Sequence, residues 1–523
     1  MVVSAVRSAQ LLLLALIGCR AAEPPSQKPV EIVAKSPARP KKPPTVSIDK
    51  PHVFVPDNLA WLAFGGGSEP SSNQVSLAQD IALLNGTLSS PGLVLFASGP
   101  GAQVAVEQPA GEPPQRGDAR SALSRLFGMP GAAHTRYEPT QIHVDGPATS
   151  EHVMRTLSQA LTRGSTPLLV YVASHGERGE SPAENSLGLW GGWSIKVRDV
   201  ARLIDVIDTP RPSRFVVTAC YGGGFANLLF VDGEPDQGVR RGDLCGLFAA
   251  PWDDEASGCD PNPDRRAQES YSIHFLHALT GRDRERRSRR AEIDIDRDGT
   301  INLLEAHTWA RIHSKSFDVP TTTSERYLRY ATPVLADGSL DPLSAPEDLH
   351  VVKVLGDELE LHSEEEARTR LSDLTGMVDS QRDAVEHAQK AADDAFYALR
   401  IALLERWPLL DHPWDPRTLT LVEREESAML ELLEHSELAK AHLAAEERLQ
   451  HALSTFDDAR VVRARALRLV RAFETVRMAS ALKQHGGPEH ARYQAIRRCE
   501  RFAPKLRRER PAPRSSTGGD GPS

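Results

Sequence analysis

The stretches "PLLVYVASHG" at residues 167–176 and "RFVVTACYGGG" at residues 214–224 decide the expected fold. Each is an apolar run that ends near a chemically reactive side chain, His175 in the first and Cys220 in the second. The runs are apolar throughout, as is typical of strands that are covered on both faces of a parallel sheet. Functional groups in such sheets collect just past the carboxyl ends of the strands. We therefore expect His175 and Cys220 to lie at the same edge of one sheet.

More strands and helices are expected around these two runs. Apolar runs that fit strands occur at residues 61–66, 92–98 and 141–145, and amphipathic stretches that fit helices occur at residues 76–84, 150–161 and 197–207. Alternation of strands and helices predicts an α/β fold with a mostly parallel sheet flanked by helices. Residues 101–138 are rich in Gly and Pro, and they are expected to form an irregular insertion.

A thiol and an imidazole at one sheet edge can perform nucleophilic catalysis. Because the thiolate is the attacking species, Cys220 needs a base, and His175 can take the thiol proton and later protonate a leaving amine. The backbone amides of Gly176 and Cys220 could donate to a developing oxyanion. The alternative is that Cys220 only packs and that His175 is a polar residue at a strand end. The joint occurrence of both motifs favours catalysis.

Around these residues the sequence resembles the caspase-like superfamily of cysteine peptidases, most closely its legumain-like branch. The resemblance runs from about Trp61 to Leu279 and includes "WLAFGGGSEPSSNQ" at residues 61–74, a strand that opens with Trp and leads into a Gly-Ser loop. By this resemblance, His175 and Cys220 are the catalytic pair of a caspase-like sheet. It implies endopeptidase hydrolysis of a peptide or protein substrate through a thioester acyl-enzyme.

The same resemblance implies residues that bind substrate. "SGCDPNPDRRAQESYSIHFL" at residues 257–276 matches the segment that builds the primary specificity pocket, which places Glu269 and Tyr271 in that pocket. Asn73 could orient His175 or could cap its own loop, and both roles stay open.

The sequence also departs from the legumain-like pattern. Ser174 replaces the Asp that precedes the His-Gly pair, and Val75-Ser76 stand where the family has an arginine in its first specificity loop. Three glycines follow Tyr221 in place of the family's Ser-Gly type of sequence. A preference for Asn or Asp at the scissile bond is therefore not implied.

Residues 294–305, "DIDRDGTINLLE", have the spacing of an EF-hand-type calcium loop. The expected ligands are the side chains of positions 1, 3, 5, 9 and 12 and a backbone carbonyl at position 7, namely Asp294, Asp296, Asp298, Asn302, Glu305 and Thr300. The very basic segment before the loop does not form an amphipathic entering helix, so a single loop with structural Ca²⁺ is expected. The alternative is an acidic, solvated loop.

The N-terminus has the features of a bacterial lipoprotein signal. Residues 1–18 combine a basic residue with a short apolar stretch, and Leu16-Ile17-Gly18-Cys19 resembles a lipobox, so Cys19 is the expected site of lipidation. The alternative is an ordinary secretory signal. Residues 19–51 are rich in Pro and Lys and are expected to form a tether. These features predict a lipid-anchored protein of the bacterial cell envelope, at the periplasmic face or the cell surface.

In such a compartment disulfides persist, and Cys245 and Cys259, which are close in the sequence, are the expected pair. The net charge of −9 and the mixing of acidic and basic residues give no indication of nucleic-acid binding.

The C-terminal part is expected to be helical. Residues 52–345 form the expected peptidase domain and residues 346–505 a helical hairpin or coiled coil, followed by a disordered tail at residues 506–523. Apolar residues recur at steps of three and four on one helical face, namely Leu438, Ala441, Ala445, Leu449, Ala452 and Phe456. The proline-rich stretch at residues 407–416 should interrupt the helix.

These observations together predict a calcium-stabilised cysteine endopeptidase anchored in the envelope. The helical region could bind a protein partner or hold the catalytic domain away from the membrane. The alternative function is a catalytically inactive, peptidase-like scaffold that binds an envelope partner through its helical region. A transpeptidase, in which an amine replaces water, would use the same residues.

Overall fold

The computed structural model describes residues 54–107, 118–129, 135–207, 210–332, 341 and 343–507. The predicted signal peptide, Cys19, the tether and the tail beyond residue 507 lie outside the described residues.

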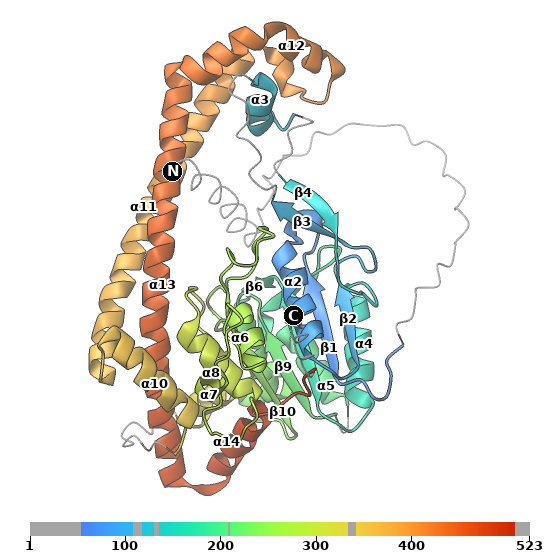
Figure 1. Cartoon of the computed structure of the whole chain (residues 1–523), viewed down its shortest axis with the longest axis vertical. Helices are drawn as coiled ribbons and strands as arrows, with labels where there is room; N and C mark the ends of the chain where they lie inside the picture. The colour runs from blue at the N-terminus through green and yellow to red at the C-terminus, as the bar shows by residue number, and fades with distance from the viewer. Residues whose placement is uncertain are drawn as a thin grey trace, which may run out of the picture.

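A six-stranded sheet is the centre of the α/β region (Figure 1). Its strands, in their order across the sheet, are β11 (Thr321–Thr322), β10 (Leu244–Phe248), β9 (Ser213–Val217), β5 (Leu168–Ser174), β1 (Trp61–Gly66) and β2 (Gly92–Phe96). All neighbours pair in parallel except β10 and β11, which are antiparallel. The predicted α/β class with a mostly parallel sheet is thus confirmed.

Alternate residues of each central strand enter cores on opposite faces of the sheet. One core contains Tyr171 and Val216 and is covered by α2 (Val75–Thr87), α6 (Tyr271–Leu279) and α8 (Leu303–His313). The other contains Val170 and Phe215 and is covered by α4 (Ser150–Thr162) and α5 (Val197–Asp205). Burial of both faces explains why these strands are apolar at every position.

Two expectations for the α/β region were wrong. Residues 141–145 form no strand, because this segment makes only a single bridge, between Gly146 and Leu95, and uses the Asp145 carboxylate to accept from the Val94 amide. The insertion at residues 101–138 is more regular than expected, since it contains β3 (Gln103–Glu107), β4 (Thr135–Pro139) and α3 (Ala119–Phe127). A further small sheet contains β6 (Gly176–Glu177), β7 (Ser186–Leu189) and β8 (Trp193–Lys196).

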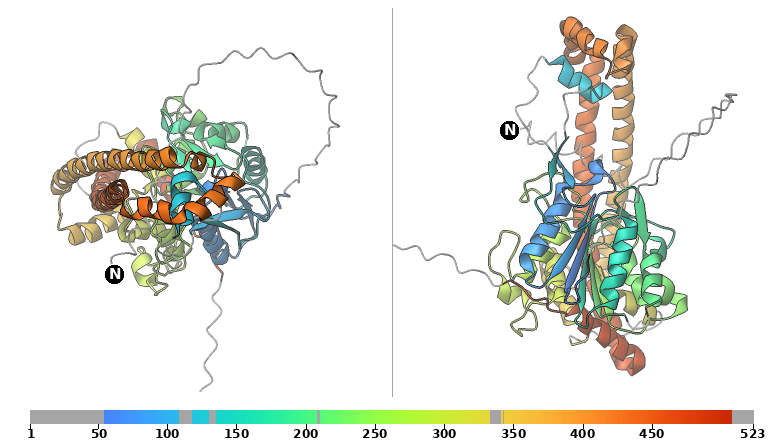
Figure 2. Two further views of the ribbon diagram at one scale, coloured as in Figure 1. Left: turned by 90° about the horizontal axis from the view of Figure 1, so that it is seen from above. Right: turned by 90° about the vertical axis from the view of Figure 1, so that its right-hand side faces the viewer.

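Long helices form the C-terminal region, as predicted. The α-helices not yet named are α7 (Arg290–Ile293), which precedes α8, and then α9 (Thr323–Ala331), α10 (Pro346–Leu359), α11 (Glu364–Arg406), α12 (Pro416–Leu430), α13 (Glu437–His485) and α14 (Gly487–Glu500). α11 and α13 run side by side as a hairpin that stands along one side of the α/β region, and α12 lies at its far end (Figure 1). α3 reaches this far end and packs there with α11 and α12 (Figure 2).

The packing seam of the hairpin follows only part of the predicted stripe. Ala445 and Leu449 are buried against Ala392 of α11, as expected. Leu438, by contrast, is 39% exposed and takes no part in the seam. The prolines at residues 408, 413 and 416 interrupt the helix at the predicted place.

The C-terminal elements share cores with the sheet. Val476 and Leu482 of α13 pack in one cluster with Phe230 and Cys245 from the α/β region. The chain then returns to the opposite edge of the sheet, where Leu506 bridges Leu88. The first two residues of the predicted tail therefore have ordered partners.

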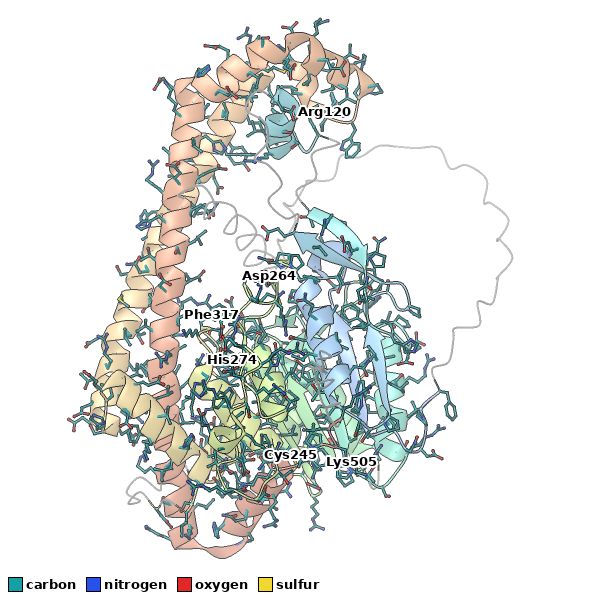
Figure 3. All side chains as sticks on the ribbon, viewed as in Figure 1. Arg120, Cys245, Asp264, His274, Phe317 and Lys505 are labelled. Carbon is teal, nitrogen blue, oxygen red and sulfur yellow. A yellow bond between two sulfur atoms is a disulfide. The ribbon has the colours of Figure 1, made fainter. Side chains whose placement is uncertain are left out.

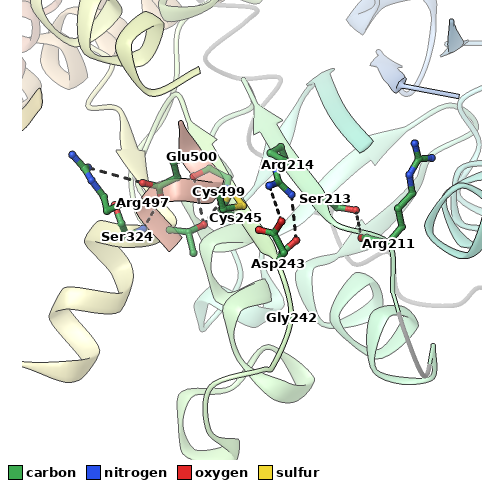
Figure 4. The surroundings of a disulfide bond; sticks show 12 residues. Arg211, Ser213, Arg214, Gly242, Asp243, Cys245, Ser324, Arg497, Cys499 and Glu500 are labelled. Carbon is green, nitrogen blue, oxygen red and sulfur yellow. Dashed lines mark hydrogen bonds and ion pairs between the residues drawn. A yellow bond between two sulfur atoms is a disulfide. The ribbon is translucent and has the colours of Figure 1, made fainter. Parts of the chain in front are cut away.

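The predicted disulfide between Cys245 and Cys259 was wrong. Cys245, on β10, is bonded to Cys499 at the end of α14 (Figure 4). Cys245 and Lys505 lie near the same end of the sheet, where the C-terminal segment returns (Figure 3). Proximity in sequence gave the wrong pair, because 254 positions separate two cysteines that the packing of α14 on β10 brings together.

Buried charges join α10 and α14 to the rest of the fold. Arg497 pairs with Glu347 and Asp348, and Asp348 also pairs with Arg311 of α8. Glu500 is fully buried, accepts from the Ser324 amide at 2.7 Å, and has one oxygen without a hydrogen-bond partner. Burial outweighs the attraction of Arg497 and raises the pKa of Glu500 to about 7.

This raised pKa predicts a pH-dependent contribution to stability. Between pH 4.5 and 7, Glu500 holds a proton in the folded chain but has lost it in the unfolded chain. Rising pH therefore favours the unfolded chain in this range, and the stability that the proton on Glu500 contributes below pH 4.5 is lost as pH rises through 7. Glu500→Gln mimics the protonated side chain. Its free energy of unfolding should therefore rise relative to that of wild type by about 3 kcal/mol between pH 4.5 and pH 8.

Urea unfolding of both proteins at the two pH values, with the disulfide intact, measures this difference. Glu447→Gln, at an exposed position of α13, is the control and should track wild type. A constant difference between Glu500→Gln and wild type would contradict the assignment.

Candidate active site

His175 and Cys220 lie next to each other at the carboxyl edge of the sheet, as predicted. β5 and β9 pair in parallel from Leu168 to Val172, His175 follows β5 directly, and Cys220 comes three residues after β9. A Cβ atom on Gly176 would lie 1.9 Å from the carbonyl oxygen of Cys220. The backbones beside the imidazole and the thiol are therefore in direct contact, and only glycine fits at position 176.

The loop after β1 fixes the imidazole of His175. Its Nε2 lies 2.7 Å from the carbonyl oxygen of Ser72 and 2.9 Å from Oε1 of Gln74. Both partners are acceptors, so Nε2 carries the proton and donates. Nδ1 is then the unprotonated nitrogen, which is the form a general base needs.

Cys259 contacts this nitrogen of His175 through its sulfur. Its Sγ lies 3.5 Å from Nδ1 of His175, and Cys259 is partly exposed. Cys220 is 6% exposed, and its Sγ lies 3.4 Å from both the amide nitrogen and the carbonyl oxygen of Ala256. Two thiols outside any disulfide of the described chain therefore lie around one histidine, and the sequence had indicated only one of them.

Two roles were left open for Asn73, orienting His175 or capping its own loop, and its contacts fit loop capping. Its Oδ1 accepts from the Gly67 amide at 3.0 Å, and its Nδ2 donates to the Gln103 carbonyl at 2.6 Å. The side chain is fully buried. The contacts that orient His175 come instead from the two residues that flank Asn73, of which Gln74 contributes a side chain.

Two of the three glycines after Tyr221 are required by close packing. Tyr221 itself has φ of +57°, and the chain then turns into a short 3-10 helix over Gly222–Leu229. A Cβ atom on Gly223 would lie 2.7 Å from the Ala250 carbonyl oxygen, and one on Gly224 would lie 2.8 Å from that of Pro182. The departure from the family's Ser-Gly sequence has a steric cause at both positions.

Glu269 and Tyr271, the predicted pocket residues, both have partners within the fold. Tyr271 is fully buried, stacks on Phe275, and has its hydroxyl 2.9 Å from Nδ1 of His307. Glu269 pairs with Arg284 and His274 and accepts from the Lys315 amide. Both side chains are used in holding α6 and the end of α8 together, and their role in a specificity pocket stays a prediction.

Carboxyl groups do lie beside the histidine loop. Asp260 follows Cys259, and its backbone is held by Ser76 through an amide and a hydroxyl contact. Burial raises the pKa of Asp260. Burial and the nearby Asp260 raise the pKa of Glu107, whose amide donates to the Pro261 carbonyl. The wall of the site next to Cys259 is thus acidic.

A group of carboxylates in the predicted calcium loop could hold a cation. One oxygen each of Asp294, Asp296 and Glu305 lies within 4.8 Å of the others. Asp294 Oδ1 is buried and has no hydrogen-bond partner, which suits a metal ligand. Gly299, at φ +83°, makes the turn at position 6, and its amide donates to the other oxygen of Asp294.

The other predicted ligands lie outside this group of three carboxylates and take part in hydrogen bonds of backbone amides in the loop. Asn302 caps α8 by accepting from the Glu305 amide, and Asp298 accepts from the Thr300 amide. The loop joins the short helix α7 to α8, as expected for a single loop, and its Ile301 enters the same core as Cys220. The donors therefore fit a cation, and binding would stiffen the start of α8.

Comparisons with known proteins do not assign the chain to a family: no family model matches it, and no curated protein matches it. The fold defines the coarser class, an α/β chain with a mostly parallel sheet and a long helical C-terminal region. Within the described ranges, no helix has both the length and the apolar character needed to cross a membrane.

The Gly176 contact predicts a sharp steric effect. Gly176→Ala should destabilise the fold by about 1–3 kcal/mol, because the added methyl group collides with backbone that cannot move independently. Urea unfolding measures the effect. Gly376→Ala is the matched control, since nothing lies within 4 Å of a Cβ there and alanine favours the helix. Equal stability of Gly176→Ala and wild type would contradict the described contact.

Proposed function

We propose that the chain is a caspase-like cysteine endopeptidase, most similar to the legumain-like branch, and that it hydrolyses peptide bonds in peptide or protein substrates. The observation that carries the proposal is the meeting of His175 and Cys220 at the ends of two neighbouring parallel strands. The imidazole supports it further, because Ser72 and Gln74 leave its Nδ1 basic. The legumain-like motifs quoted above supply the reaction type.

In the proposed mechanism, Nδ1 of His175 takes the proton of Cys220, whose Sγ leaves the backbone of Ala256. The thiolate attacks the carbonyl carbon of the scissile bond, and the amides of Gly176 and Cys220 donate to the oxyanion. The imidazolium returns its proton to the amine as the C–N bond breaks. Water, deprotonated by His175, then hydrolyses the thioester and frees Cys220.

Cys259 is a second candidate for the nucleophile. The 3.5 Å contact with His175 favours it, and its greater exposure would ease the approach of substrate. The resemblance to the family favours Cys220. The two assignments differ in which sulfur would carry the acyl group, so covalent labelling distinguishes them.

Labelling with peptide acyloxymethyl ketones tests the proposal. The chain without residues 1–19 is treated with a probe library in the presence of calcium, and the modified residue is mapped by mass spectrometry. We expect modification of Cys220 in wild type and in Cys259→Ser, and a loss of at least 100-fold in His175→Ala, in line with the contribution of a general base.

The remaining outcomes lead to other conclusions. Modification of Cys259 that persists in Cys220→Ser would transfer the nucleophile to Cys259. A folded chain that no probe labels would favour the inactive scaffold that binds an envelope partner through its helical region. Products joined to an added amine, rather than hydrolysed, would indicate a transpeptidase.

We also propose that the loop at residues 294–305 binds structural Ca²⁺, with Asp294, Asp296 and Glu305 as its central ligands. Calcium should raise the melting temperature with a midpoint on the order of 0.1–1 mM, as for extracellular sites. Asp294→Asn with Glu305→Gln should abolish both the shift and the heat of binding in calorimetry. Asp264→Asn, at an exposed position, is the control. Absence of heat with wild type would contradict the site.

The predicted signal peptide and Cys19 support a place for this activity in the bacterial cell envelope, with a lipid anchor in the membrane. Residues 19–51 would then act as the tether between the anchor and the α/β region. A disulfide between β10 and α14 is compatible with this oxidising compartment.

A further inference from the structure

We propose that α13 of the helical hairpin positions the active-site loop at residues 252–260, and that Arg460 and Arg463 are positioning residues for Cys220. The inference rests on the proposed function only in calling this site catalytic. It assigns a role to the hairpin, which periodicity alone left open.

The inner side of this loop holds both thiols. Ala256 contacts the sulfur of Cys220 through its amide and its carbonyl, each at 3.4 Å. The Asp254 carbonyl accepts from the Tyr221 amide at 2.9 Å. Three residues after Ala256, Cys259 reaches His175. Any shift of the loop therefore moves the sulfur of Cys220, the backbone beside it and the partner of the imidazole.

The outer side of the same loop is acidic and meets arginines of α13. Arg460 Nη2 lies 3.0 Å from Oε2 of Glu255, and Arg463 Nη2 lies 3.1 Å from Oδ2 of Asp254. Arg460 also stacks on the ring of Phe317, with its guanidinium carbon 3.7 Å from the centroid. The two ion pairs thus hold the two residues that directly precede Ala256, which is the residue that contacts Cys220.

A third arginine fixes α13 itself against the domain. Arg468 is fully buried and donates to four backbone carbonyls at 2.7–3.1 Å, those of Arg311, Ser314, Ser316 and Asp318. Burial lowers the pKa of Arg468 to about 10, so it keeps its charge at neutral pH. The Asp318 carboxylate in turn accepts from the amide and hydroxyl of Ser257. The loop is therefore held on both sides of Ala256.

Apolar packing also docks α13. Phe473 and Val476 already join buried clusters with the α/β region and α10. The arginines add contacts whose positions follow the acidic stretch "DDE" at residues 253–255. The ion pairs thus join α13 to the loop at residues that the apolar clusters do not include.

The test is a comparison of thiol reactivity that needs no peptidase activity. In Arg460→Ala/Arg463→Ala, loss of both ion pairs should release the loop, and iodoacetamide should modify Cys220 at least fivefold faster than in wild type. Arg465→Ala is the matched control, because Arg465 lies on the same helix and pairs with Glu358 of α10 instead of the loop. It should leave the rate unchanged.

A charge swap guards against simple misfolding. Arg463→Asp alone should accelerate alkylation, and adding Asp254→Arg should restore a rate within twofold of wild type. With a cleaved substrate, the double alanine variant should lower kcat with little change in KM. Unchanged alkylation in the double variant, equal acceleration in Arg465→Ala, or failure of the swap to restore the rate would overturn the proposal.

The two proposals fail separately. A chain that no probe labels but whose Cys220 alkylation follows this pattern would lose the peptidase assignment and keep the role of α13. A chain that the probes label normally, but whose Cys220 alkylation is unchanged in the double variant, would keep the peptidase assignment and lose the role of α13.

Discussion

The contact between the backbone of Gly176 and the carbonyl of Cys220 is the constraint on which the site depends. It exists because β5 and β9 are parallel neighbours that end at almost the same level. A side chain at position 176 would push the two strand ends apart and separate the imidazole from the thiol. The apolar faces of these strands fix their register from both sides, so the two cores that bury the sheet also hold the site together.

The helical region is tied to this sheet at several points. Cys499 links α14 covalently to β10, which is the direct neighbour of β9, the strand that leads to Cys220. α3 connects the α/β region to the far end of the hairpin, where α11 and α12 meet. A boundary at residue 345 describes the change in composition well, but shared cores cross it. The hairpin is therefore a part of the same packed body as the site.

Sequence patterns predicted the features that are determined by residues close together in the chain. Continuous apolar runs gave β5 and β9, and the parallel order then implied that His175 and Cys220 meet. The partners that come from distant segments could not be read in this way: Cys499 for the disulfide, and Cys259 for the imidazole. For Glu269 and Tyr271, motif similarity indicates a position in the chain, while packing against α8 determines what the side chains contact.

The contacts of α13 differ in strength in a way that suits a movable loop. Arg468 is buried with four carbonyl partners, and a guanidinium that is taken from water is costly to leave unpaired, so this anchor stays fixed. Asp254 and Glu255 each keep about a quarter of their side-chain surface in solvent, so their ion pairs are partly screened and worth about 1 kcal/mol or less each. A firm anchor beside weaker, reversible contacts lets the loop adjust around Cys220 while α13 stays in place.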